Sequence, residues 1–141
     1  MEKEKLLRKA LRLNANFYLL LGLSLVIFCQ GYSQLLKVDN LFGLIILGIP
    51  LIGLAIVQHH QSENKSLNIQ YIILAVAGNL FVLFFLLYGS IAASQSLTAM
   101  GKLVVYILTL TELIFAVLQI GGMHYLFSEE RKSRGRGRVT A

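Results

Sequence analysis

The sequence has little of what water-soluble proteins use most. Only 14% of its 141 residues are charged, whereas soluble domains contain about 25% charged residues. It has one cysteine, one proline and no tryptophan. A single cysteine excludes an intrachain disulfide and a CxxC metal or redox motif. The scarcity of charge excludes a disordered chain and an ordinary soluble enzyme.

What the sequence does contain is long apolar runs. Hydrophobic residues make up 56% of the chain, and its mean hydropathy is +0.69. A bilayer core of roughly 30 Å is spanned by a helix of about 20 apolar residues. Four stretches are long enough, at residues 15–36, 41–57, 69–93 and 103–127. The sequence therefore predicts an all-α, multi-pass membrane protein with a four-helix transmembrane bundle over residues 15–127.

Both ends of the chain are basic. In residues 1–14, leucines alternate with charges at roughly helical spacing, which predicts a short amphipathic helix on the inner membrane surface. Residues 128–141 are rich in arginine and glycine, which predicts a flexible tail without the aromatic platforms that nucleic acids stack on. We expect no nucleic-acid partner. The expected contacts to anionic lipid headgroups are Arg8, Lys9, Arg12, Arg131, Lys132 and Arg134.

The distribution of positive charge predicts the orientation of the spans. Lysines and arginines gather at the two ends, and Lys65 lies between the second and third stretches. The other two connections hold only Lys37 and Lys102. Because cytoplasmic segments carry an excess of positive charge, the pattern predicts that the N and C termini are both cytoplasmic. An even number of spans agrees with this topology.

A duplicated helical hairpin is one interpretation of the internal organisation. Asn14 and Phe17 open the first span much as Asn68 and Tyr71 open the third. Two spans separate these positions, so the copies would run parallel. The matches are few, and leucine-rich helices also match by chance, so both alternatives stay open.

Glu112 is the one charged residue deep within a predicted span. Thr109 and Gln119 share its helical face, at offsets of −3 and +7. Asn79 and Gln30, on other spans, are the further candidate partners. A charged side chain inside a bilayer costs at least a few kcal/mol, and no lysine or arginine lies within a span to offset that cost. We therefore expect Glu112 to be protonated much of the time.

Three roles remain open for Glu112: a hydrogen-bonded tie between helices, a proton or cation site, or a contact to a partner subunit. The histidines His59, His60 and His124 fall near the inner ends of spans two and four, which leaves a haem or quinone protein as a weaker alternative. Their spacing resembles no zinc motif. We expect neither a metal nor a cofactor.

The sequence contains no recognisable catalytic set, P-loop or dinucleotide-binding motif. The leading expectation is a non-enzymatic accessory or assembly subunit, either in a homo-oligomer or in a larger membrane complex. The alternative is a small proton- or cation-coupled membrane carrier that uses Glu112.

Overall fold

The computed structural model describes residues 2–37, 39, 41–64, 66–92, 95 and 97–137. This part of the chain is helical apart from short connections, as the sequence predicts. The helices are α1 (Glu2–Ile27), α2 (Cys29–Leu36), α3 (Leu41–Glu63), α4 (Ile69–Ala92) and α5 (Ala99–Gly137). Four of them, all except α2, are long and apolar enough to cross a membrane.

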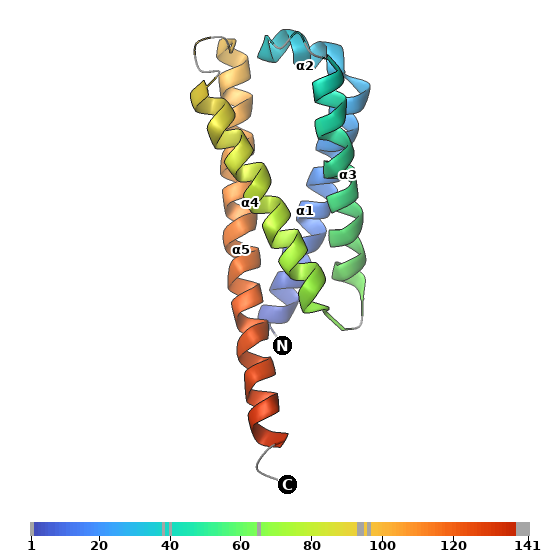
Figure 1. Cartoon of the computed structure of the whole chain (residues 1–141), viewed down its shortest axis with the longest axis vertical. Helices are drawn as coiled ribbons and strands as arrows, with labels where there is room; N and C mark the ends of the chain where they lie inside the picture. The colour runs from blue at the N-terminus through green and yellow to red at the C-terminus, as the bar shows by residue number, and fades with distance from the viewer. Residues whose placement is uncertain are drawn as a thin grey trace.

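The four long helices run side by side along one axis, and α2 lies across one end of the bundle (Figure 1). The chain alternates in direction, so α1 begins and α5 ends at the same end of the bundle. The connection between α3 and α4 also lies there. We call this the inner end, and the end that carries α2 the outer end. The last part of α5 extends past the other helices at the inner end.

Helix α1 differs from its prediction, because residues 1–14 do not form a separate amphipathic helix. The helix runs without interruption from Glu2 to Ile27. Leu7 and Leu11 are buried in the bundle against Ile72 and Val76 of α4, whereas a helix lying on the membrane surface would direct them into lipid. The 3.6-residue period simply continues past residue 14, so one helical face is buried along most of its length.

The first predicted span, residues 15–36, also ends earlier than expected. At Phe28 the backbone leaves helical geometry, with φ −106° and ψ 31°, and this separates α1 from α2. The stretch Glu4–Ile27 contains 24 residues, which corresponds to about 36 Å of helix at 1.5 Å per residue. It is long enough to span the bilayer without α2.

Two other helices outlast the stretches predicted for them. α3 passes residue 57 and ends at Glu63, so its last turns carry polar residues. α5 passes residue 127 and reaches Gly137, taking in much of the segment that was expected to be a flexible tail. Charged residues such as Arg131 are acceptable helix formers, so the described helix continues through them to Gly137. Residues 138–141 of the predicted tail lie outside the described residues.

Backbones approach most closely where α1 crosses α3. A Cβ atom built on Gly48 would lie 2.8 Å from the carbonyl oxygen of Gly22, and one built on Gly22 would lie 2.8 Å from that of Gly48. No larger residue fits at either position without moving a backbone. Small residues at helix crossings are typical of packing in membranes, where close van der Waals contact replaces the hydrophobic effect.

Candidate functional site: a buried polar centre

Six polar side chains from four helices meet inside the bundle, and all are 0% exposed. We call this group the polar centre. It consists of Asn14 and Tyr18 of α1, Gln58 of α3, Asn79 of α4, and Glu112 and Gln119 of α5. Offsets of four residues on α1 and seven on α5 put each pair on one helical face.

The polar centre lies between two apolar layers. Leu7 and Leu11 belong to a buried cluster on its inner side. Leu25, Leu44 and Leu51 belong to a second cluster, toward the outer end, which also includes Tyr18. A polar group removed from water costs free energy unless it is hydrogen-bonded. The bonds inside the centre therefore decide whether the four helices pack stably.

Asn79 is the hub of the polar centre. Its Oδ1 accepts hydrogen bonds from Asn14 Nδ2 at 2.8 Å, from the Tyr18 hydroxyl at 2.9 Å and from Gln58 Nε2 at 3.1 Å. Its Nδ2 donates to Gln119 Oε1 at 3.1 Å. One side chain of α4 is thus bonded to α1, α3 and α5.

The three amides of Gln58, Asn79 and Gln119 form a closed ring. Gln58 donates to Asn79, Asn79 donates to Gln119, and Gln119 Nε2 donates back to Gln58 Oε1 at 3.4 Å. Each amide gives one bond and accepts one within the ring. If all three amides turn by 180°, every bond reverses direction and the ring stays closed.

Tyr18 connects Glu112 to this ring. Its hydroxyl lies 2.8 Å from Glu112 Oε2 and 2.9 Å from Asn79 Oδ1, but a phenol carries a single hydrogen. Both contacts are hydrogen bonds at once only if Glu112 is protonated and donates to Tyr18, which then donates to Asn79. With the amides oriented as they are, the donor count fits a neutral glutamic acid.

Two atoms of the polar centre lack a hydrogen-bond partner among the described residues. They are Glu112 Oε1 and Asn14 Oδ1, and both are buried. Both are acceptors, or can be, and no buried donor side-chain atom in that part of the chain is left unpaired. The centre is therefore short of donors, and a partner that completed it would have to donate.

The structure brings together three of the five residues that the sequence grouped. Glu112, Gln119 and Asn79 all belong to the polar centre. Thr109 instead donates to the carbonyl of Val105 in its own helix, at 2.8 Å. Gln30 lies exposed on α2.

Sequence reasoning missed the other three members. Asn14 and Gln58 stand just outside the predicted spans, and Tyr18 stands near the start of one, where tyrosines typically lie at the membrane interface. The signal was the helical period itself. Leu7, Leu11, Asn14 and Tyr18 follow one another at intervals of three or four residues, so they share a face.

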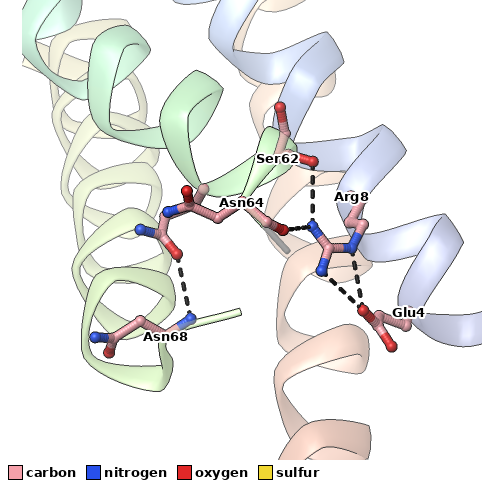
Figure 2. Close-up of polar contacts among 6 residues, drawn as sticks. Glu4, Arg8, Ser62, Asn64 and Asn68 are labelled. Atoms are coloured by element: carbon pink, nitrogen blue, oxygen red, sulfur yellow. Dashed lines mark hydrogen bonds and ion pairs between the residues drawn. The ribbon is translucent and has the colours of Figure 1, made fainter. Parts of the chain in front are cut away.

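Arg8, one of the expected headgroup contacts, bonds to the protein (Figure 2). Its guanidinium donates to Glu4 of the preceding turn, and to the backbone carbonyls of Ser62 and Asn64 where α3 ends. Carbonyls at the end of a helix have no partner within it. Arg8 satisfies two of them and fixes the connection from α3 to α4 against α1.

That connection ends at a capped helix. Asn68 precedes α4, and its Oδ1 accepts a bond from the backbone N–H of Gln70 at 2.9 Å, as an N-cap does. Its own N–H donates to Gln61 Oε1 at 3.2 Å. Asn68 is exposed and outside the helix, whereas Asn14 is buried within α1. The two asparagines that suggested a duplicated hairpin therefore hold different positions, and the duplication stays a prediction.

The other expected headgroup contacts are distributed as follows. Arg12 pairs with Glu63 across α1 and α3, at a site where both side chains are more than half exposed. Lys9 and Arg131 are exposed. The side chains of Lys132 and Arg134 lie outside the described residues.

The histidines do not converge on one site. His59, His60 and His124 are all exposed, and the described residues contain no group of three or more His, Cys, Asp or Glu side chains placed to hold a metal ion. His59 lies 3.8 Å from Glu63, one turn further along α3. Both histidines of α3 line a groove between α1 and α3 at the inner end.

Comparison with protein-family models, with curated proteins and with solved structures finds no match for this chain.

Proposed function

We propose that the chain is a multi-pass membrane protein that binds and releases a proton at Glu112, as the centre of a small proton-coupled carrier. The observation that carries the proposal is the bonding of Glu112. Its carboxyl is fully buried between four apolar helices and is bonded through the Tyr18 hydroxyl to a ring of amides that can reverse.

The reversible ring offers the carboxyl two hydrogen-bonded states. When Glu112 is protonated, it donates to Tyr18, and Tyr18 donates to Asn79 Oδ1. When the proton leaves, Tyr18 turns its hydrogen to the carboxylate, and Asn79 presents its amide nitrogen to the Tyr18 oxygen. Gln58 and Gln119 turn with Asn79, and Asn14 has to turn as well, because its Nδ2 lies 2.8 Å from the position that the Asn79 amide nitrogen takes up. Tyr18 keeps a partner on each side in both states, so neither state leaves its hydroxyl unpaired.

The surroundings of Glu112 suit a site that changes charge. Tyr18 is the titratable group bonded to it, while α3 and α4 present the neutral amides Gln58 and Asn79. No ion pair of the described residues involves Glu112. A permanent partner such as arginine would fix the carboxylate in its charged form, whereas neutral dipoles can follow the proton.

The proposal is tested by reaction with dicyclohexylcarbodiimide, which modifies protonated carboxyls in apolar surroundings. We expect Glu112 in intact membranes to be modified, and modification to slow as the pH is raised. Glu112→Gln is the control that should remain unmodified. The proposal would be contradicted if Glu112 reacted at none of the pH values at which the protein stays folded.

We place the four long helices across a cytoplasmic-type membrane, with the inner end of the bundle on the cytoplasmic side. The start of α1 and the end of α5 then both lie on that side. Eleven of the thirteen lysines and arginines then lie inside, as the charge bias of membrane proteins favours. In a Cys29→Ser background, cysteines introduced at the exposed positions Gln34 and Ser66 should be labelled from opposite sides. Labelling of both from one side would overturn this topology.

An accessory or assembly subunit is the second candidate. The observation that favours it is α5, whose 39 residues carry it past the rest of the bundle at the inner end (Figure 1). A projecting helix with basic residues could contact a partner protein or anionic lipid. Under this alternative Glu112 is only a tie between helices, and Glu112→Gln should retain full activity.

A further inference from the structure

An apolar cavity of about 200 Å³ lies in the outer half of the bundle. All five helices contribute to its wall, and its lining is hydrophobic throughout except for the hydroxyl-bearing Tyr32 of α2. The Tyr32 hydroxyl is itself bonded to Ser24, at 3.1 Å. The volume is about seven times the roughly 30 Å³ that one water occupies in the liquid. It can hold one ring or a short alkyl chain.

The cavity lies directly on the outer side of the polar centre. Each of the four long helices supplies a lining residue one helical turn from its own polar residue. Leu21 follows Tyr18 by three positions, and Val82 follows Asn79 by three. On the two helices that run the other way, the lining residues precede the polar ones by four positions: Leu54 precedes Gln58, and Leu108 precedes Glu112. The cavity therefore lies about one helical turn from the polar centre, although none of the six polar-centre residues lines it directly.

The polar centre specifies what kind of molecule would fit. Its two unpartnered buried atoms, Glu112 Oε1 and Asn14 Oδ1, leave it short of a donor. Once Glu112 has released its proton, its carboxylate has no positively charged group beside it among the described residues. Burying a lone carboxylate is costly unless a cation pairs with it. A protonated amine supplies the donor and the charge together, and an apolar body attached to it would occupy the cavity.

We propose that the cavity and Glu112 together bind a small lipophilic amine, which exchanges with the proton on Glu112. This inference rests on the proton-binding function proposed above. The exchange is balanced without any covalent step: the ammonium ion binds as the Glu112 carboxyl gives up its proton, so one proton leaves for each cation bound. The ammonium then donates to the carboxylate, while the hydrocarbon part lies among Leu54, Val82 and Leu108.

The test is calorimetric titration of the purified protein in nanodiscs with three probes. They are 2-phenylethylamine, 2-phenylethanol with the same body but no charge, and ethylamine with the charge but almost no body. We expect 2-phenylethylamine to bind saturably and to release about one proton, measured as a dependence of the heat on the ionisation enthalpy of the buffer. The alcohol and ethylamine should each bind about tenfold more weakly or worse, since one lacks the charge-assisted bond and the other the apolar contact. Equal binding of the alcohol, or binding without proton release, would overturn the inference.

Two matched variants locate the site. Leu108→Trp fills the cavity and should abolish amine binding. Ile107→Trp adds similar bulk at the next position, whose side chain is 55% exposed on the outside of α5, and should leave binding unchanged. Equal binding by both variants would place the amine elsewhere. The probe series uses the unaltered chain, so it decides the matter even if Leu108→Trp does not fold.

The carbodiimide reaction separates this inference from the proposed function. If Glu112 reacts with dicyclohexylcarbodiimide but 2-phenylethylamine does not bind, the amine site is wrong and the proton site stands. If Glu112 does not react, the proton site itself is wrong. If the amine binds, it should protect Glu112 from the reagent, because both require the same carboxyl.

Discussion

Replacement of Asn79 by leucine tests whether the polar centre holds the bundle together. Leucine has the same number of heavy side-chain atoms and the same branching, but it is bulkier and neither donates nor accepts hydrogen bonds. The change removes the hub of the centre and with it four interhelical bonds, to Asn14, Tyr18, Gln58 and Gln119. It also leaves the amide nitrogens of Asn14 and Gln58 without Asn79 Oδ1, the acceptor that they share.

The size of the effect follows from those bonds. Interhelical hydrogen bonds in membrane proteins average about 0.6 kcal/mol each and reach about 1.7, so four of them contribute roughly 2–3 kcal/mol. Each buried polar group that finds no new partner adds about 1–3 kcal/mol. Rearrangement of the Gln58 and Gln119 amides, which can still bond to each other, recovers part of that cost. We expect Asn79→Leu to lower the free energy of unfolding by about 2–5 kcal/mol.

The assay is unfolding in mixed micelles of mild detergent and dodecyl sulfate, followed by circular dichroism. Ser90→Ala is the matched control on the same helix. The Ser90 hydroxyl donates to the carbonyl of Leu86 within α4, at 2.8 Å, and connects no two helices of the described residues, so its loss should change stability by less than about 0.5 kcal/mol. If Asn79→Leu is no less stable than Ser90→Ala, the hydrogen bonds of the polar centre do not hold the helices together.

Two further predictions concern packing at the helix crossing and at the inner end. Gly48→Leu should strongly reduce the yield and melting temperature of folded protein, because its Cβ would lie 2.8 Å from a backbone oxygen of α1. Gly53→Leu on the same helix is the control, since its Cβ meets open space and the change should be tolerated. Equal melting temperatures of the two variants would show that α1 and α3 do not cross closely at Gly48. Arg8→Ala should speed hydrogen exchange of the amides where α3 ends and α4 begins, because the two carbonyls that it satisfies lose their donor, while Lys9→Ala, at an exposed neighbour, should not. Equal exchange in both variants would contradict the proposed fixing of this connection.

The number and approximate positions of the long helices could be predicted from the sequence, because hydropathy and length decide them. The ends could not, since polar residues such as Gln58 look like loop residues until a partner is known. Asn14 and Gln58 become interior residues only because Asn79 of α4 bonds to both. Hydropathy measures each helix against lipid and carries no information about which polar residue meets which.

Glu112 shows the same division between what is local and what depends on the fold. Its isolation from basic side chains and its shared face with Gln119 could be read from the chain. The role of Tyr18 could not be predicted from the sequence, because a tyrosine near the end of a predicted span is typical of an interfacial position. Its burial and its bonds to both Glu112 and Asn79 follow from how α1, α4 and α5 pack together.

Infrared difference spectroscopy of the carboxyl group is the most direct test of the proton site at Glu112. The protein in lipid vesicles is titrated with acid and base, and the C=O stretch of the protonated carboxyl is followed. We expect a band near neutral pH that disappears reversibly as the pH rises, is absent in Glu112→Gln, and shifts in frequency in Tyr18→Phe because the hydrogen-bond partner is lost. A protein that shows no such band at neutral pH, or whose band persists unchanged in Glu112→Gln, would contradict a protonated Glu112 at the centre of the bundle.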